Sequence, residues 1–238
     1  MNSNERLFLI DCAEGTQLQL RRQRIHFQRI RHIMISHLHG DHFYGLIGLL
    51  TSFHLLGRKD ELHLYGPPEL SEIIDIQLRV SNTVLVYPLI FHPLVMDKYD
   101  LIFEDEKVTV HSFPLVHSVP TCGFIFREKR AERNSVSGAR SYAYCSDTCY
   151  SESILPFIQN CSLLYHEATF MQAMSQAAKD KFHSTTIEAA MIAVKSGAKK
   201  LLIGHYSARY DDLQPLLEEA RSVFPNTIAA EDGLKISI

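Results

Sequence analysis

Residues 33–42, Ile-Met-Ile-Ser-His-Leu-His-Gly-Asp-His, restrict the fold most, because an apolar run that reads as a buried strand leads into three histidines and an aspartate. His37 and His39 are two residues apart, so they point to the same side of an extended backbone. The glycine turn after them lets Asp41 and His42 face a second position. Imidazole and carboxylate groups are ligands that zinc accepts, and burying them without a cation would leave polar atoms unsatisfied. The stretch therefore predicts a metal site at the end of a strand.

Further ligands are expected later in the chain, because four groups do not complete the shells of two metal ions. His117, Asp147 and His205 each follow an apolar run that reads as a strand. The end of a strand is where an α/β sheet places its functional groups. Four other histidines, within or before strands, are predicted to be structural or surface residues: His26, His32, His63 and His111.

Strand-like and helix-like runs alternate through most of the chain, which is typical of an α/β protein. An apolar helix is predicted over 43–56, and a helix opened by proline over 67–80. The chain contains no internal repeat and no obvious linker, so we predict one α/β domain over residues 1–238, built as a four-layer αββα sandwich. Strands are predicted at 85–91, 100–104, 107–113, 122–127, 227–230 and 234–238.

The formal net charge of −3 excludes a chain that binds nucleic acid through overall basicity. Positive charge is nevertheless concentrated in two places. A local basic face can bind phosphate even on a slightly acidic protein, although a solvated helix face gives the same pattern. Five arginines precede the histidines and four basic residues lie in a polar loop at 127–140: Arg21, Arg22, Arg24, Arg29 and Arg31, then Arg127, Lys129, Arg130 and Arg133.

The sequence shows no membrane or secretory segment. No apolar run approaches the roughly 20 residues that span a bilayer, and the first residues lack the basic and apolar regions of a signal peptide. Five cysteines are an odd number in a chain that needs no disulfide stapling, so reduced thiols in the cytoplasm are predicted. Cys145 and Cys149 could bind zinc, but their spacing favours structural thiols.

Several tracts resemble the motifs of one family. Residues 37–42 fit His-x-His-x-Asp-His, the signature of the metallo-β-lactamase superfamily. Phe-Leu-Ile-Asp-Cys-Ala-Glu-Gly-Thr-Gln at 8–17 resembles the first motif of the ribonuclease Z family, the tRNA 3′-processing endoribonucleases. Further motifs of that family are resembled by Pro-Leu-Val-His at 114–117, Cys-Ser-Asp-Thr at 145–148, His-Glu-Ala-Thr at 166–169, His-Ser-Thr at 183–185 and Gly-His-Tyr-Ser-Ala-Arg-Tyr at 204–210.

The resemblance implies a hydrolase of the metallo-β-lactamase fold with two zinc ions. Two such ions, about 3.5–4 Å apart, lower the pKa of a shared water towards neutrality and polarise a phosphate. Asp41 would also steer or accept the proton of that nucleophile. Seven residues would hold the ions: His37, His39 and His117 the first, Asp41, His42 and His205 the second, with Asp147 bridging them.

The resemblance also implies roles for residues around the metals. His183 would protonate the leaving 3′-oxygen, a task that imidazole suits near neutral pH, and Glu167 would orient it. Asp11 would orient a ligand histidine, as metal-bound imidazoles usually require. Arg209 could pair with the phosphate. His166 is either catalytic or a structural hydrogen-bonding residue.

The chain departs from the family pattern in two places. The family begins with a glycine-containing β-hairpin before the first motif, and we expect that hairpin to be missing here. The family's long arm, which clamps the elbow of tRNA, normally lies between the motifs of His117 and Asp147. Here that region holds only the shortened basic loop at 127–140.

We therefore predict a zinc-dependent endoribonuclease that cleaves precursor tRNA at its 3′ end and leaves a 3′-hydroxyl, working in the cytoplasm as a homodimer. The shortened arm leaves open a general phosphodiesterase of the same fold, acting on small or cyclic phosphodiesters. An inactive, truncated binding subunit is the other alternative.

Overall fold

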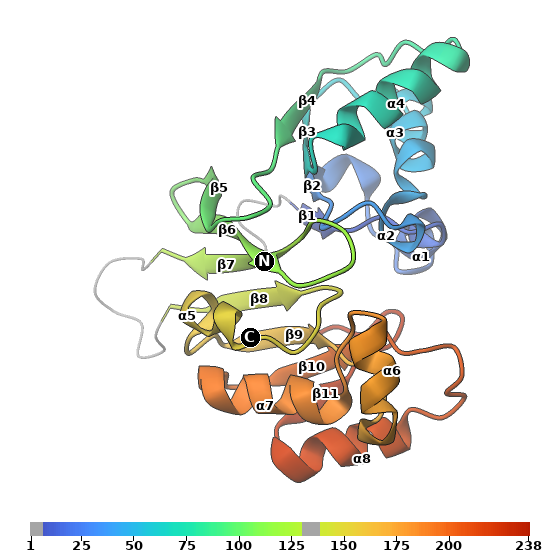
Figure 1. Ribbon diagram of the computed structural model, residues 1–238. Helices are drawn as coiled ribbons and strands as arrows, with labels where there is room; N and C mark the ends of the chain where they lie inside the picture. The colour runs from blue at the N-terminus through green and yellow to red at the C-terminus, as the bar shows by residue number, and fades with distance from the viewer. Residues whose placement is uncertain (1–6, 130–138) are drawn as a thin grey trace. The chain divides into compact units, whose positions relative to one another are not determined.

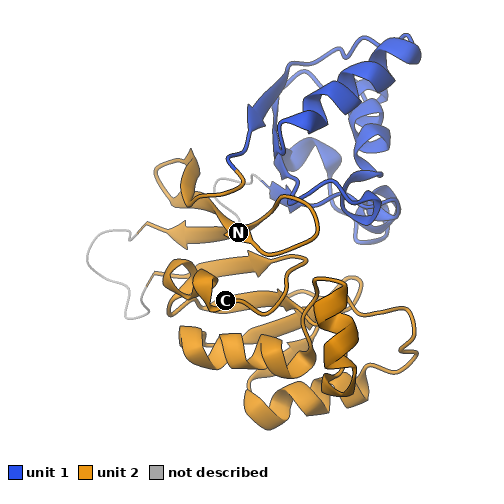
Figure 2. Ribbon diagram, viewed as in Figure 1, with its two compact units in different colours: residues 1–95 blue, residues 96–238 orange. Residues whose placement is uncertain are grey.

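The computed structural model describes residues 7–129 and 139–238, and the chain divides into two compact units. The N-terminal unit is Met1–Val95 and the C-terminal unit is Met96–Ile238 (Figure 2). Each unit has its own β-sheet and its own cluster of buried apolar side chains. None of the described helices is long and apolar enough to cross a membrane.

The N-terminal unit contains four parallel strands in the order β1-β2-β3-β4 (Figure 1). Parallel neighbours need long crossover connections, and helices supply most of them. The strands are β1 (Leu7–Ile10), β2 (Ile30–Met34), β3 (Leu62–Gly66) and β4 (Leu89–Pro93). The helices are α1 (Thr16–Arg22), α2 (Gly40–Phe43), α3 (Leu46–Leu55) and α4 (Glu69–Val80), with a 3-10 turn η1 (Phe27–Arg29).

Adjacent residues of β2 bury their side chains on opposite faces of this sheet. Ile33 belongs to one buried cluster with Phe53 of α3, so one face packs against helices. On the other face, the ring of His32 stacks on the rings of Phe8 and His63, with centroids 4.7 and 5.1 Å apart. His32 and His63 therefore have a packing role.

The C-terminal unit contains seven strands in the order β11-β10-β9-β8-β7-β6-β5. The strands are β5 (Asp100–Glu104), β6 (Val108–Leu115), β7 (Thr121–Glu128), β8 (Ser141–Cys145), β9 (Leu163–Glu167), β10 (Leu201–Gly204) and β11 (Thr227–Ala229). The helices are α5 (Leu155–Ile158), α6 (Ser175–Asp180), α7 (Thr186–Ser196) and α8 (Gln214–Val223), with 3-10 turns η2 (Glu152–Ile154) and η3 (Gln172–Met174).

Strand direction brings four strand ends to one edge of this sheet. β6 is antiparallel to β7, and β7 is antiparallel to β8, so β6 runs in the same direction as β8. β9 and β10 are parallel to β8. The carboxyl ends of these strands therefore lie at one edge, where α/β sheets place functional groups. The residues at or just after these ends are His117, Asp147, Glu167 and His205.

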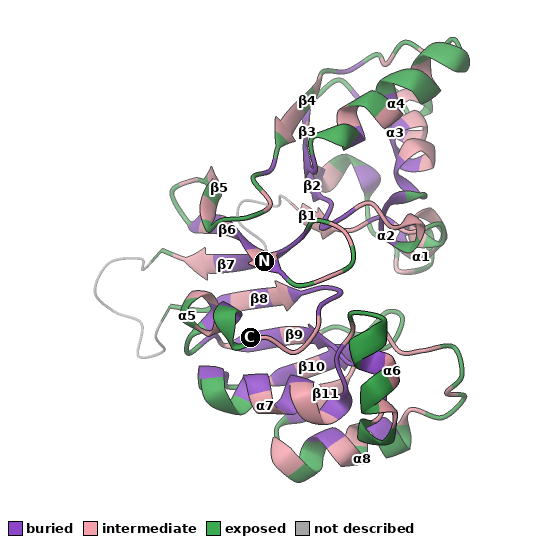
Figure 3. Cartoon of the chain, viewed as in Figure 1, coloured by how far each residue is buried: buried purple, intermediate pink, exposed green. Residues whose placement is uncertain are grey.

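Helices α5, α7 and α8 supply the apolar residues that pack against this sheet, and Figure 3 shows the contrast between buried strand residues and the exposed turns of α8. Small residues such as Ala189 and Ala193 let α7 approach the strands closely. The helix begins with a capping box formed by Thr185 and Glu188 and ends at Gly197, whose φ of 66° suits glycine.

The helix predicted over 43–56 forms as α3 over Leu46–Leu55, and its first residue, Phe43, instead ends the separate short helix α2. The reason is a close approach at Gly45, whose amide donates to the Cys12 carbonyl at 2.9 Å. A Cβ atom at Gly45 would lie 1.9 Å from the carbonyl oxygen of Ala13. The main chain is therefore drawn toward the loop after β1 at this point.

Two predicted strands also differ. The strand expected at 85–91 begins only at Leu89, because Tyr87 turns into the core and its hydroxyl donates to the Leu50 carbonyl at 3.0 Å. No strand forms over the described residues 234–238, where a turn closed by the Leu234 amide on the Glu231 carbonyl follows edge strand β11. Most of the loop predicted at 127–140, with Arg130 and Arg133, lies outside the described residues.

Candidate metal centre

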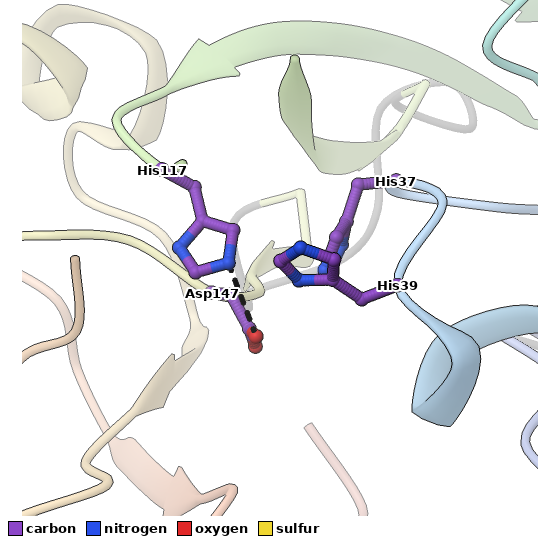
Figure 4. A group of neighbouring side chains, drawn as sticks. All are labelled: His37, His39, His117 and Asp147. Atoms are coloured by element: carbon purple, nitrogen blue, oxygen red, sulfur yellow. Dashed lines mark ion pairs between the residues drawn. The ribbon is translucent and has the colours of Figure 1, made fainter. Parts of the chain in front are cut away.

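The loop after β2 carries the histidine stretch in the N-terminal unit. His37 is fully buried, and its ring lies edge-on to that of His39, with centroids 4.8 Å apart (Figure 4). The ring of His42, on α2, lies 4.1 Å from that of His37. Asp41 is exposed, and its Oδ2 lies 3.7 Å from Nε2 of His42. The four side chains proposed as ligands from this stretch thus lie together in one unit.

A partly buried hydrogen-bond network orients two of these imidazoles. Oδ2 of Asp11 lies 2.8 Å from Nδ1 of His42 and also accepts from the Ser36 hydroxyl at 2.9 Å. The Ser36 hydroxyl lies 3.0 Å from Nδ1 of His37, and the Ser36 amide donates to Oδ1 of Asp11 at 2.8 Å. One carboxylate therefore orients His42 directly and His37 through a hydroxyl.

The main chain holds Asp11 in this position. The Asp11 amide donates to the Met34 carbonyl at 2.8 Å, and the Cys12 amide donates to the His42 carbonyl at 2.7 Å. Asp11 has a φ of 56°, in the left-handed region that is unfavourable for residues other than glycine. The loop after β1 is thus bonded both to the end of β2 and to the helix that carries His42.

In the C-terminal unit, a buried aspartate faces two histidines at the sheet edge. Asp147, which is 2% exposed, follows β8. Its Oδ2 lies 3.7 Å from Nε2 of His117, as the dashed line in Figure 4 marks. Its Oδ1 lies 3.3 Å from Nε2 of His205. Each carboxylate oxygen therefore faces one imidazole, an arrangement that suits a bridging ligand.

These two histidines are held through their other ring nitrogen. Nδ1 of His117 donates to the Phe182 carbonyl at 2.8 Å, and Nδ1 of His205 lies 2.9 Å from the hydroxyl of Thr169. Phe182 and His205 have φ values of 58° and 59°, a conformation that costs on the order of 1–2 kcal/mol for such residues. Strain of this kind clusters at functional sites.

One bonding pattern recurs in both units. A hydroxyl, carboxylate or carbonyl of the protein bonds Nδ1, so Nε2 is the nitrogen suited to a metal. Metal-bound histidines almost always donate their other N–H to such a group, and imidazole with carboxylate is a donor set that zinc accepts. These residues therefore fit zinc. The pattern holds for His37, His42, His117 and His205.

A second buried carboxylate holds a histidine in the C-terminal unit. Glu167, at the end of β9, is fully buried. Its Oε1 lies 2.8 Å from Nδ1 of His183 and accepts from the Thr148 amide at 3.1 Å. Its Oε2 accepts from the amide and the hydroxyl of Thr169 at 3.0 and 2.8 Å. Four donors thus fix the carboxylate, and the carboxylate fixes the ring of His183.

His183 lies beside the ligands of its own unit. One ligand atom each of Asp147, His183 and His205 lie within 4.8 Å of one another. The His183 ring is stacked on that of His205, with centroids 5.3 Å apart, and lies 5.1 Å from that of His117. Its side chain is 14% exposed. An acid in this position can reach a group held at these ligands.

His166 and Arg209 contact other groups. His166 is fully buried, its Nδ1 donates to the Glu167 carbonyl at 2.7 Å, and burial lowers the pKa of its imidazole. Neighbouring strand residues point to opposite faces, so His166 points away from the Glu167 carboxylate and the geometry favours its structural role. Arg209 is exposed, with its guanidinium 5.0 Å from the ring of Phe170 and its Nε donating to the Ser207 hydroxyl.

Four residues that contact the site have no role predicted from the sequence: Ser36, Thr148, Thr169 and Phe182. Ser36 and Thr169 act through hydroxyls, and a hydroxyl beside a candidate ligand or carboxylate is a signal that the sequence does contain. Thr148 and Phe182 act through the main chain. A main-chain contact leaves no mark on residue type, so no sequence signal could reveal it.

The predicted basic residues differ in their partners. Arg31 pairs with Asp60 at 2.7 Å, and Lys129 pairs with Glu104 at 2.5 Å. Three exposed arginines at the end of α1 and just beyond it form no ion pair with any residue that the structure describes: Arg21, Arg22 and Arg24.

The sequence of this chain is similar to a family model and to the sequences of known proteins. Residues 6–206 match the model of the Beta-lactamase superfamily domain. The Ribonuclease Z of Parabacteroides distasonis is 40% identical, covering 98% of this chain and 90% of that protein. The Ribonuclease Z of Azobacteroides pseudotrichonymphae is 41% identical, covering 100% and 91%. The first alignment spans 274 positions against 238 residues here, so that relative has internal residues without counterpart in this chain.

Solved structures show the same likeness. The short form of human tRNase Z is similar with a TM-score of 0.84 and 32% identity, covering 100% of this chain and 90% of that one. The metallo-β-lactamase fold protein YhfI of Bacillus subtilis has a TM-score of 0.76 at 23% identity, covering 98% and 88%, and shares the fold. The predicted metallo-β-lactamase fold is therefore confirmed.

Proposed function

The chain belongs to the ribonuclease Z family of the metallo-β-lactamase superfamily, and from this premise we propose that it removes the 3′ trailer of precursor tRNA with two zinc ions. As a member of this family, the chain is a phosphodiester-hydrolysing endoribonuclease of tRNA 3′-end processing. One observation carries the metal part of the proposal: in both units, candidate ligand imidazoles are bonded through Nδ1, the pattern of metal-binding histidines.

We propose residues 1–238 as one catalytic domain, as the sequence predicts. When bound, two zinc ions supply Lewis-acid activation of the attacking water and of the scissile phosphate. The proposed set consists of His37, His39 and His117 for one ion, Asp41, His42 and His205 for the other, and Asp147 between them.

Asp41 and His183 move the protons in this proposal. Asp41, an exposed carboxylate beside His42, accepts the proton of the attacking water. Attack forms a new bond from the water oxygen to phosphorus and breaks the bond from phosphorus to the ribose 3′-oxygen. His183, held at Nδ1 by Glu167, donates the proton on Nε2 to that leaving oxygen. The tRNA then ends in a 3′-hydroxyl, and the phosphate stays on the trailer.

Arginines of the N-terminal unit bind the phosphates of tRNA in this proposal. Arg21, Arg22 and Arg24 are exposed near the end of α1, and contacts from such residues to phosphates release counterions. Arg209, held against Phe170, would contact a phosphate near the cut.

We extend the proposal to a cytoplasmic homodimer. The resemblance to the family suggests the dimer, and five cysteines, an odd number in a chain that needs no disulfide stapling, suit a reducing compartment. Light scattering of the purified chain measures the molar mass in solution, and a mass of one chain at micromolar concentration would contradict the dimer.

The test of the proposed function uses two substrates with the zinc-loaded full chain. One is a precursor tRNA with a 3′ trailer, and the other is bis(p-nitrophenyl) phosphate. We expect a tRNA of mature length whose 3′ end can be extended by poly(A) polymerase, which requires a 3′-hydroxyl. His183→Ala is the control for cleavage of the tRNA, because this variant should lose that reaction and retain hydrolysis of the nitrophenyl ester.

Other outcomes favour the two alternatives. Hydrolysis of the nitrophenyl ester without any cut in the tRNA would favour a general phosphodiesterase. This alternative is supported by the internal residues of the P. distasonis protein that have no counterpart in this chain. Binding of tRNA with no hydrolysis of either substrate would favour an inactive binding subunit.

A further inference from the structure

The hydroxyl of Thr169 lies between a candidate metal ligand and the pair of Glu167 and His183. It is 2.9 Å from Nδ1 of His205 and 2.8 Å from Oε2 of Glu167. Nδ1 of His183, at 3.3 Å, is farther from it than from Glu167. Thr169 is 6% exposed, so water competes little for these bonds.

The chemistry of a hydroxyl decides the direction of each bond. A hydroxyl has one hydrogen to donate and lone pairs that accept. The Thr169 hydrogen goes to Oε2 of Glu167, so its oxygen accepts from Nδ1–H of His205. A neutral imidazole protonated on Nδ1 has its lone pair on Nε2, and Nε2 is the atom that faces Asp147.

The N-terminal unit contains the same hydrogen-bond arrangement, formed by other residues. There the Ser36 hydroxyl donates to Asp11 and accepts from Nδ1 of His37, while Asp11 bonds His42 directly. In each unit a carboxylate bonds one imidazole directly and a second imidazole through a hydroxyl. Because this arrangement occurs twice, on unrelated elements, it indicates that the hydroxyl holds the imidazole in place.

We propose that Thr169 is a positioning residue that fixes the Nδ1-protonated form of His205 and links this ligand to the carboxylate that orients His183. The inference rests on the proposed function, which assigns His205 to the metal and His183 to the leaving oxygen. Without the hydroxyl, Nδ1–H of His205 loses its acceptor, and the ring is no longer held in the metal-binding form.

Two substitutions separate the hydroxyl from the shape of the side chain. Thr169→Val keeps the branched shape and removes the hydroxyl, whereas Thr169→Ser keeps the hydroxyl. Thr227→Val is the control, because Thr227 is also buried in the C-terminal unit and its hydroxyl donates to a main-chain carbonyl, that of Phe224. Chelator competition measures the zinc affinity of each chain.

Thr169→Val is expected to weaken zinc binding by about 10–100-fold, the usual effect of removing a group that orients a metal ligand. Thr169→Ser and Thr227→Val are expected to bind zinc like the unchanged chain. Equal zinc affinity in Thr169→Val and the unchanged chain would overturn the proposal. Losses of equal size in Thr169→Ser and Thr169→Val would also overturn it, because the methyl group rather than the hydroxyl would then matter.

Histidine ¹⁵N spectra give a readout that needs neither zinc nor substrate. They are recorded on metal-free protein at about pH 8, above the ordinary histidine pKa, and the His205 signals are assigned by their loss in His205→Gln. The unchanged chain should show His205 protonated on Nδ1. Protonation on Nε2 instead would overturn the proposal even if Thr169→Val did not fold. Failure of the proposed function is separate, because it would appear as intact precursor tRNA with the zinc and ¹⁵N results unchanged.

Discussion

Replacing His183 by alanine isolates proton donation from metal binding. The imidazole is not among the proposed ligands, and its removal leaves Oε1 of Glu167 with the Thr148 amide as donor. Loss of one hydrogen bond costs about 0.5–1.5 kcal/mol, so the chain should fold and load zinc. Removing a general acid slows cleavage by about 10²–10⁴-fold. At about 1.36 kcal/mol per tenfold change, the barrier rises by about 2.7–5.4 kcal/mol.

The assay compares two leaving groups under single-turnover conditions. The ribose 3′-oxygen of precursor tRNA is a poor leaving group that needs a proton, whereas nitrophenolate leaves without one. His183→Ala should therefore lose cleavage of tRNA by the factor above and retain hydrolysis of bis(p-nitrophenyl) phosphate. His63→Ala is the matched control, because His63 is a partly buried histidine with a packing role in the other unit.

Two results would refute this reasoning. Equal rate losses on the two substrates would mean that His183 acts before the bond to the leaving group breaks. Loss of zinc in His183→Ala, measured on the same preparation by elemental analysis, would mean that His183 is a ligand.

The remaining predictions concern the carboxylates, the grip on tRNA and pH. Glu167→Gln should lower the free energy of unfolding in urea by about 1–3 kcal/mol, because its NH₂ group must face donors that now bond the carboxylate, and a chain of unchanged stability would contradict this. The purified chain should hold two zinc ions and Asp147→Ala fewer, whereas full zinc content in Asp147→Ala would exclude Asp147 as a ligand. Affinity for tRNA should fall steeply as the salt concentration rises, and neutralising Arg21, Arg22 and Arg24 should make that fall less steep. An unchanged slope of affinity against salt concentration would mean that other residues bind the phosphates of tRNA. Burial lowers the pKa of His166, so acid protonates this histidine more readily in the unfolded chain than in the folded one. As pH falls below about 6.5, His166 should therefore lower the free energy of unfolding by at most about 1.4 kcal/mol per pH unit. In His166→Gln, the free energy of unfolding measured across an acid titration should fall less steeply.

The fold could be predicted where the pattern is local. Apolar runs followed by polar residues marked the strands β6, β8 and β10 and the positions of His117, Asp147 and His205 just beyond them. The break between α2 and α3 could not be predicted, because it depends on Gly45 meeting a carbonyl that belongs to the loop after β1. Such an approach is a property of the folded chain and not of the helical pattern.

The candidate site could be predicted as a set of side chains, and its support only in part. Imidazoles and carboxylates were visible as residue types, and the resemblance paired Glu167 with His183, which lie 2.8 Å apart. The carbonyl of Phe182, which holds His117, is a group that every residue possesses. Its place in the site follows from a backbone angle, and a residue type alone does not specify that angle.

The left-handed backbone at Asp11, Phe182 and His205 bears on how this protein can be engineered. Glycine adopts that conformation without the Cβ clash that the present residues experience, so a library screened for heat resistance alone would enrich glycine at these positions. Glycine at 11 and 205 would delete a carboxylate and an imidazole from the site, and only position 182, which serves through its carbonyl, could accept it without losing a functional group. Thermostable variants of this chain should therefore be selected on activity as well as on melting temperature.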